Sequence, residues 1–363
     1  MSNLQISLAI AGGAILAAVV AYNTWTSRKN EPRKPEPEPE PDSQQAGTDL
    51  TDPLARREPG LDAALVDPLE PTQAGAAPAG LGVPLPVPER KPGLDSLIDV
   101  IAPMTLEGVV SGDAALAASP HTRRAGSKPF AIEGLNESTQ HWETPVPGQR
   151  YGAFQAGVQL ANRTGALNEI EFSEFVMKAQ AFADAVNALP EFPDMLHEVA
   201  RGRELDQFAS DHDAQLTFSL RARQAAWSPG YVQQNAARLG FVPGVIPGRM
   251  VLPSTVAGLP PMLGLTYDAQ AAMADDPEQS ALRDISLHLD VPQVPRSEQP
   301  FRQLRQVAQA LAEAMDGVVT DQNGNLIPDQ AMDAIGVDLE QLYDALDSRD
   351  LAAGSPQARR LFS

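Results

Sequence analysis

The longest hydrophobic pattern in the chain is an uninterrupted apolar run near its N-terminus. From Leu4 to Trp25 no side chain carries a charge, and Arg28 and Lys29 follow shortly after. About 22 residues at 1.5 Å each make a helix of roughly 33 Å, which is enough to cross a hydrocarbon core. The run therefore predicts a transmembrane anchor over residues 1–27. The residues expected to form the anchor and its exit are Leu4, Ile10, Ile15, Val20, Trp25, Arg28 and Lys29.

The charges around this run indicate its orientation. Arg28, Lys29, Arg33 and Lys34 follow the run, whereas the side chains before Leu4 are uncharged. Because basic residues are enriched on the cytoplasmic side of membranes, we expect the N-terminus outside and the remaining chain inside. A cleavable signal peptide is the alternative, although its basic residues would precede a shorter apolar core.

Residues 28–94 are predicted to form a disordered linker rich in Pro and Glu. The stretch from Glu31 to Leu94 holds 14 of the 33 prolines and has no helical or strand period. Pro and Glu alternate from Pro35 to Asp42, a pattern typical of extended polyproline II stiffened by charge repulsion. We expect a spacer, with a ligand for a proline-binding module as the alternative.

The chain after Leu94 alternates between strand-like and helical patterns. Apolar and polar residues alternate over 216–220, 262–267 and 285–290, which favours half-buried strands. Ser228 and Gly240 bound one helix, a second helix starts at Phe301, and a hairpin turn at Asn323-Gly324 precedes a third. This order predicts the α+β class: an antiparallel sheet with helices on one face, leaving the other face free.

Two segments resemble each other at a constant offset. Residues 172–187 and 301–316 share the pattern Ala-Gln-Ala-(Phe/Leu)-Ala-(Asp/Glu)-Ala, and 157–161 matches 286–290 at the same offset. We interpret 95–205 as an α+β unit that is a degenerate copy of the unit at 206–348. Chance similarity between Ala-rich helices is the alternative. Residues 349–363 are expected to form a flexible tail.

Composition and motifs argue for a binding protein without a cofactor. The net charge is −20, with 47 acidic and 27 basic residues, which disfavours a nucleic-acid partner. Cysteine is absent, which rules out disulfides and thiolate metal sites and agrees with a reducing compartment. We find no phosphate-binding loop, nucleophile elbow or metal-ligand spacing, so we expect no catalytic residues, no metal and no enzyme activity.

The order of anchor, Pro-rich acidic linker and C-terminal α+β domain resembles the ZipA family of membrane-anchored bacterial cell-division proteins. The residues that carry this resemblance are Trp25-Thr-Ser-Arg-Lys29, Ala237-Arg-Leu-Gly-Phe241, Leu289-Asp-Val-Pro292, the helix end at 308–317 running into Val318-Val-Thr-Asp321, and Pro328-Asp-Gln330. The resemblance covers 1–94 in organisation and about 214–347 in pattern. Residues 95–205 have no place in the usual family layout.

The resemblance implies a split β-α-β fold whose open sheet face binds the C-terminal tail of FtsZ. It also implies an inner-membrane location, with a periplasmic N-terminus, a cytoplasmic head and a role in septum assembly. The residues expected to contact the peptide are Thr217, Ser219, Phe241, Val242, Thr266, Tyr267, Asp268, Ser286 and His288.

This face departs from the family's apolar cleft, because its outward positions are polar and Asp268 and Asp290 add negative charge. We expect Phe241, Val242 and Tyr267 to supply the apolar contact. A plain solvated sheet face is the structural alternative. The functional alternative is a membrane-tethered scaffold that binds a different envelope or division protein, or associates with its own copy.

Overall fold

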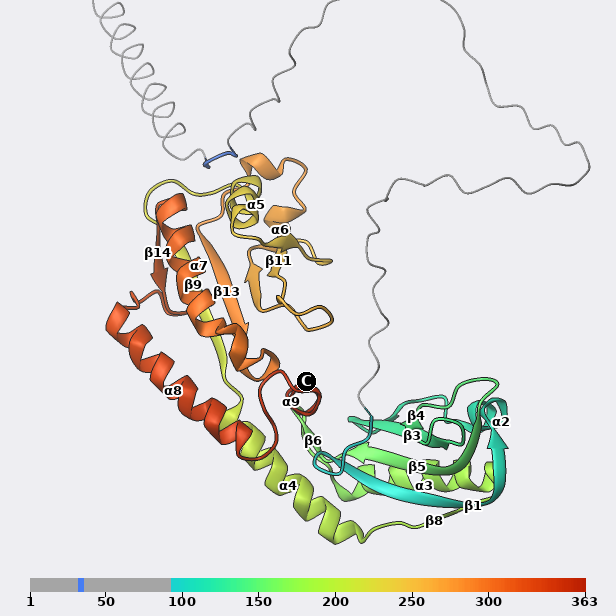
Figure 1. The fold of residues 1–363 in the computed structure, drawn as a ribbon. Coiled ribbons are helices and arrows are strands. Elements are labelled where there is room, and N and C mark those ends of the chain that lie inside the picture. Colours follow the sequence, from blue (N-terminus) through green and yellow to red (C-terminus); the bar gives the residue numbers. More distant parts are fainter. Residues whose placement is uncertain (1–31, 36–92) are drawn as a thin grey trace, which may run out of the picture. The chain divides into compact units, whose positions relative to one another are not determined.

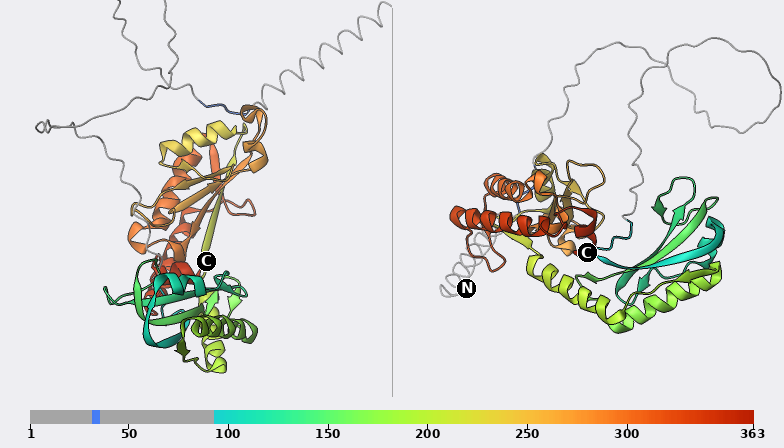
Figure 2. Two further views of the ribbon diagram at one scale, coloured as in Figure 1. Left: turned by 90° about the vertical axis from the view of Figure 1, so that its right-hand side faces the viewer. Right: turned by 60° about the horizontal axis from the view of Figure 1, so that its bottom comes forward.

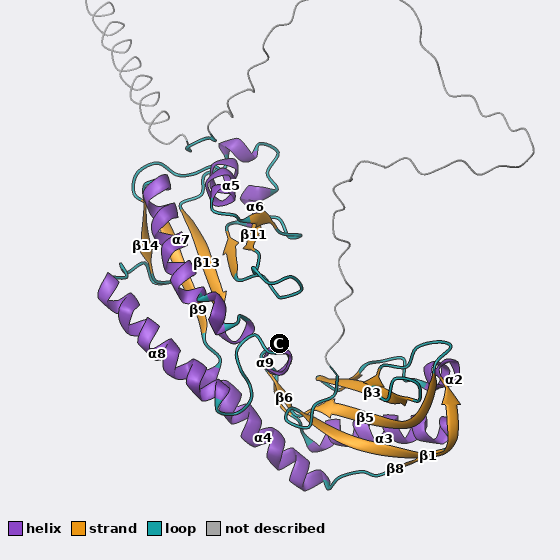
Figure 3. Ribbon diagram, in the orientation of Figure 1, coloured by secondary structure: helices purple, strands orange, loops and turns teal. Residues whose placement is uncertain are grey.

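The computed structural model describes residues 32–35 and 93–363. The predicted anchor, from Leu4 to Lys29, lies outside these residues, as does most of the predicted linker. Among the residues that are described, none of the helices is both long enough and apolar enough to cross a membrane. The described chain contains antiparallel sheets and helices, so the α+β prediction is confirmed (Figure 1, Figure 3).

The first lobe, residues 95–213, contains a sheet in the order β2-β3-β5-β1-β8, with β4 paired to β3. Its strands are β1 (Asp99–Ser111), β2 (Arg124–Ala125), β3 (Lys128–Asn136), β4 (Trp142–Glu143), β5 (Arg150–Gln159) and β8 (Ala188–Pro190). A separate pair consists of β6 (Ala161–Asn162) and β7 (Gly165–Ala166). The helices are α2 (Gly112–Ala118), α3 (Glu169–Val186) and α4 (Met195–His212). One sheet face is covered by α3, which buries Phe172, Phe175 and Phe182 (Figure 2, right).

The second lobe, residues 214–348, contains a sheet in the order β10-β11-β12-β13-β9-β14. Its strands are β9 (Gln215–Ala222), β10 (Val242–Pro243), β11 (Arg249–Leu252), β12 (Leu263–Thr266), β13 (Asp284–Asp290) and β14 (Gly317–Thr320). The helices are α5 (Pro229–Arg238), α6 (Ala269–Ala272), α7 (Pro300–Met315) and α8 (Asp329–Asp347). Short 3₁₀ turns occupy Pro277–Gln279, Val291–Gln293 and Arg296–Glu298.

The helix boundaries and the buried helix face that the sequence predicted for the second lobe are present in the structure. Ser228 caps α5 by accepting a hydrogen bond from the Tyr231 N–H at 3.2 Å, and Pro229 is the first helical residue. Gly240 follows the helix with a φ of 90°, a conformation that costs other residues free energy. Leu304 and Leu311 of α7 are buried in the hydrophobic core. One face of the second sheet is thereby covered.

The two lobes share one order of elements. The first follows β1-α2-β3-β5-α3-β8-α4, and the second follows β9-α5-β12-β13-α7-β14-α8. In each, the first strand lies between the strand that precedes the long helix and the strand that follows it. Both long helices end at a left-handed residue, Asn187 after α3 and Asp316 after α7. A duplicated unit would have this topology, although the first unit extends beyond residue 205, because α4 continues to His212.

The prediction of a flexible tail at 349–363 is wrong. Residues 356–361 form α9 (Pro356–Leu361), and Leu361 and Phe362 are buried in the core. Arg360 forms an ion pair with the buried Asp99 of β1, with a closest distance of 2.5 Å. The tail is ordered because it supplies apolar and charged partners to residues far away in the sequence.

The predicted linker is also not disordered throughout. Residues 32–35 lie against the second lobe, where the Arg33 N–H donates to the Ala226 carbonyl at 2.8 Å and the Arg33 carbonyl accepts from the Ser228 N–H at 2.9 Å. At the other end, the Leu94 N–H donates to Glu133 of β3 at 3.0 Å. The linker prediction for residues 36–92 lies outside the described residues.

Candidate functional site

The centre of the second sheet's face opposite α7 is formed by alternate residues of three strands, β9, β12 and β13. Phe218 and Leu220 of β9 and Leu287 of β13 point into the core. Their neighbours Thr217, Ser219, Ser286, His288 and Thr266 are half-buried and lie on the opposite face. This second face is called the open face below. The alternation that the sequence predicted for β9 and β13 places these polar residues together.

The centre of the open face is held by hydrogen bonds around His288. Its Nδ1 lies 3.1 Å from the Thr217 hydroxyl and its Nε2 lies 2.7 Å from the Thr266 hydroxyl. Ser286 pairs with Ser219 on one side and with Thr266 on the other. Burial lowers the pKa of His288 below its usual value, and the nearby charge of Arg249 lowers it further. The imidazole is therefore neutral at pH 7 and fixes the orientation of both threonines.

Three residues that were predicted to contact the peptide do not lie on the strands of the open face. Phe241 is 2% exposed and packs in the core, so its predicted role on the open face is wrong. Asp268 does not belong to a strand, because β12 ends at Thr266 and Asp268 caps the short helix α6. Tyr267 also follows the strand, and its hydroxyl accepts a hydrogen bond from Gln233 at 2.7 Å. Val242 is the predicted apolar residue that stays exposed, at 44%.

The expected negative charge at Asp290 is paired. Arg163 of the first lobe donates two hydrogen bonds to the Asp290 carboxylate, both at 2.7 Å. The same guanidinium also bonds Asp213, at 2.6 and 2.9 Å. Because Arg163 shares its single positive charge between Asp290 and Asp213, it offsets part of the Asp290 charge, and the repulsion of an acidic peptide at this end of β13 is weaker than the sequence indicated.

Two cations on the open face were missed by the sequence analysis. Arg249 begins β11 and pairs in register with Thr266, and Arg221 lies two residues beyond Ser219 on β9. Within residues 32–35 and 93–363, neither guanidinium forms an ion pair with a carboxylate. The signal available for β11 was the alternation from Arg249 to Leu252 after Gly248, whose φ is 77°.

An apolar edge borders the open face at β10 and β11. Val242 pairs with Val251, which in turn pairs with Gly264 beside His288. The hairpin between the two strands exposes Val245 fully and Ile246 to 57%. The open face thus combines a fixed polar centre, two unpaired cations and an apolar border. This combination suits a short peptide that carries both carboxylates and aliphatic side chains.

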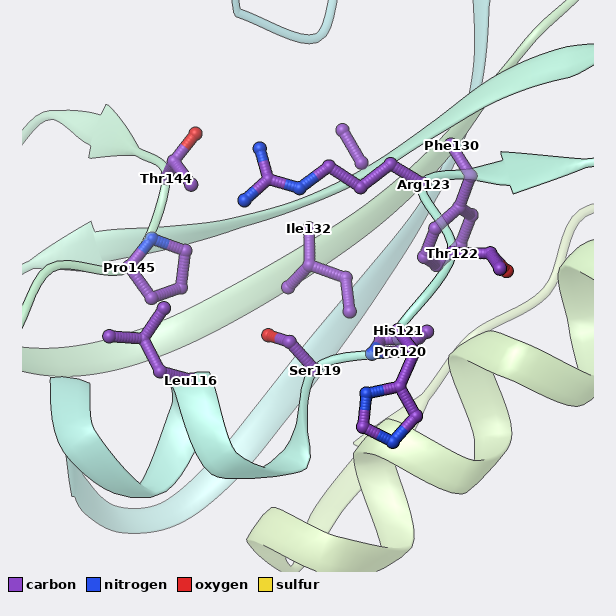
Figure 4. A pocket seen from close by; sticks show the side chains of 11 residues that line it. Leu116, Ser119, Pro120, His121, Thr122, Arg123, Phe130, Ile132, Thr144 and Pro145 are labelled. Carbon is purple, nitrogen blue, oxygen red and sulfur yellow. The ribbon is translucent and has the colours of Figure 1, made fainter.

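The first lobe contains a cavity that the sequence analysis did not identify. It has a volume of about 290 Å³ and lies between β3, the end of α2 and the segment at 144–145. Phe130 and Ile132 of β3 line it, and the Arg123 side chain extends across it toward Thr144 (Figure 4). The cavity belongs to the first lobe and lies apart from the open face.

The second lobe belongs to the α+β class, with an antiparallel sheet packed against α7 on one face. The model of the family described as "ZipA, C-terminal FtsZ-binding domain" matches residues 272–336. The match includes β13, α7, β14 and the first part of α8, and it confirms the resemblance to the ZipA family. It also contains Ser286 and His288 of the open face.

Other comparisons add no functional argument. The curated proteins gave no match. A variant of berberine bridge enzyme in complex with (S)-reticuline is 10% identical, with a TM-score of 0.15, covering 72% of this chain and 52% of that one. Berberine bridge enzyme from Eschscholzia californica is 11% identical, with a TM-score of 0.15, covering 71% and 54%. The chain spans about half the length of these enzymes, and the likeness is too low to indicate a shared fold.

Proposed function

We propose that this protein is an inner-membrane cell-division protein whose cytoplasmic head binds the C-terminal tail of FtsZ on the open face of the second lobe. The observation that carries the proposal is the family match over residues 272–336, which contains the central strand of that face. The protein acts as a tether that supports septum assembly and catalyses no reaction.

The chemistry of the open face supports binding of a short, partly acidic peptide. Arg221 and Arg249 attract carboxylates, and the Asp290 charge that would repel them is paired with Arg163. Val242, Val245 and Ile246 offer exposed apolar surface at the border. Burying an aliphatic side chain is worth at most about 1.5–3 kcal/mol, and association entropy offsets part of that gain. We therefore expect an affinity on the order of micromolar.

The anchor and linker predicted from the sequence complete the proposal. A helix over residues 1–27 places the head at the cytoplasmic surface, and a linker keeps it there at high effective concentration. Vesicle flotation tests this part: the full chain floats with lipid, and a chain lacking residues 1–27 stays at the bottom. Equal flotation of both chains would refute the anchor.

Co-sedimentation with polymerised FtsZ tests the binding step. The full chain in detergent micelles should pellet with intact FtsZ filaments and not with filaments that lack the C-terminal tail. Arg249→Glu should weaken binding by about tenfold, which equals 1.4 kcal/mol, because it reverses a charge that faces the peptide. Arg302→Glu is the matched control, since Arg302 is exposed on α7, away from the open face. Equal binding to filaments with and without the C-terminal tail would overturn the proposal.

A further inference from the structure

Residues 32–35 occupy a strand-addition site on the second lobe. Arg33 pairs in parallel with Trp227, and Trp227 pairs in the antiparallel direction with Leu282. Two backbone hydrogen bonds join Arg33 to its neighbours, at 2.8 Å to the Ala226 carbonyl and at 2.9 Å from the Ser228 N–H. Figure 1 shows this short segment in blue beside α5. We call residues 32–35 the arm.

The arm satisfies buried backbone groups of the second lobe. Trp227 and Ser228 are both 0% exposed, and Ser228 is also the cap of α5. The Ser228 N–H donates to the Arg33 carbonyl, so the arm provides an acceptor for a donor that is shielded from water. Buried N–H groups are almost always paired in folded proteins. The site is therefore shaped for an extended backbone, which the arm supplies.

Side chains make the site selective for a cation. The Arg33 guanidinium lies 3.0 Å from the Asp316 carboxylate, and both side chains are about one-third exposed. Asp316 directly follows the end of α7, where the helix carries partial negative charge. Beyond Arg33, the Pro35 ring packs beside Gly230 of α5, with its Cγ 3.4 Å from the position of a Cβ at residue 230.

From these contacts we propose that the arm is an intramolecular latch that shortens the tether. Arg33 lies six residues after residue 27, the predicted end of the anchor, so a latched head lies within about 22 Å of that end. With the arm released, the head would be attached through the predicted linker over residues 28–92, and a random coil of that length would span roughly 40–48 Å. The latch switches the head between a near and a far position. This consequence depends on the proposed anchor, whereas the latch itself does not require the membrane or FtsZ.

Disulfide trapping tests the latch directly, because the chain has no cysteine. The full chain carrying Pro35→Cys and Gly230→Cys is oxidised, and the cross-link is located by proteolysis and mass spectrometry. The matched control carries Gly60→Cys with Gly230→Cys. Position 60 is nearer to residue 93 along the chain, so without a latch it would reach residue 230 at least as readily as position 35.

We expect the pair 35/230 to cross-link about tenfold faster than the pair 60/230, since a docked segment exceeds the effective concentration of a free linker. Asp316→Arg added to the 35/230 pair should slow cross-linking, and Arg33→Asp added to Asp316→Arg should restore it. Equal rates for the two pairs would overturn the latch, as would a rate unaffected by reversing the charge of Asp316.

Energy transfer between the head and the membrane tests whether the latch shortens the tether. The full chain with Ala237→Cys, an exposed position on α5, is labelled with a donor dye and reconstituted into vesicles that contain acceptor lipids. Energy transfer should fall in the Asp316→Arg variant and return in the Arg33→Asp/Asp316→Arg variant. If flotation succeeds, cross-linking shows the latch and transfer does not change, then the latch exists without shortening the tether and the switch is refuted.

Discussion

Replacing Arg360 by alanine should destabilise the fold, because it removes the cation that pairs with a buried carboxylate. Asp99 Oδ1 lies 2.5 Å from Arg360 Nη2, and Oδ2 lies 2.8 Å from Arg360 Nη1. The Asp99 side chain is fully buried, whereas Arg360 keeps 19% of its side chain exposed. In the variant, the Asp99 carboxylate retains the hydrogen bond from the Asp95 N–H at 2.8 Å.

The expected loss follows from the burial of the two partners. Removing one partner of a buried ion pair costs about 3–5 kcal/mol. The remaining Asp95 N–H bond and the water that replaces Arg360 favour the lower limit, about 3 kcal/mol. At about 2–4 °C per kcal/mol, the melting temperature of the full chain should fall by roughly 6–12 °C.

The loss should depend on pH in a defined direction. Burial raises the pKa of Asp99, and Arg360 opposes that rise. Without Arg360 the folded-state pKa rises further above the unfolded value. A raised folded-state pKa gives a contribution that is complete below the unfolded pKa and is lost as pH rises through the folded pKa. Urea unfolding should therefore show a small deficit for Arg360→Ala near pH 4–5 and the full deficit at pH 8.

Two variants decide whether this reasoning is correct. Adding Asp99→Asn to Arg360→Ala should remove the pH dependence, because no buried carboxyl group remains to titrate. Arg203→Ala is the matched control: it breaks an exposed pair with Glu169 and should cost about 0–1 kcal/mol. Equal unfolding midpoints for Arg360→Ala and the unchanged chain at pH 8 would refute the role assigned to the C-terminal segment.

The remaining predictions concern the open face and the first sheet. Ile246→Ser should weaken binding to the FtsZ tail by roughly fivefold in co-sedimentation, while Val337→Ser, also exposed but on α8, should leave it unchanged. Because burial lowers the pKa of His288, its contribution to stability is present above about pH 6.5 and is lost as pH falls through the folded-state pKa. In urea unfolding, the free energy of unfolding of His288→Gln should therefore change less between pH 7 and pH 5 than that of the unchanged chain. An equal pH dependence of the two chains would contradict this. Gly134→Ala places a Cβ 2.4 Å from the Tyr151 ring and should cost about 1–3 kcal/mol in thermal unfolding; a loss below about 0.5 kcal/mol would show that the ring moves aside freely.

Short-range patterns were enough to predict the elements that build the open face. The alternation over 216–220 and 285–290 identified β9 and β13, and with them which side chains share a face. Ser228 and Gly240 marked the ends of α5 through capping and a positive φ. These signals work because each depends on residues that are close along the chain, where backbone geometry alone determines the outcome.

The sequence by itself determined the α+β class, the strand faces and the family resemblance, whereas only the tertiary structure decided what each exposed or charged residue does. Phe241 looked available to a peptide and is buried. From the sequence, Asp290 was expected to repel an acidic peptide, whereas in the structure it is paired with Arg163, 127 residues away along the chain. The C-terminal segment looked flexible and supplies Arg360 to Asp99, 261 residues away. Burial and ion pairing depend on distances in space, which a local pattern of hydrophobic and polar residues does not contain.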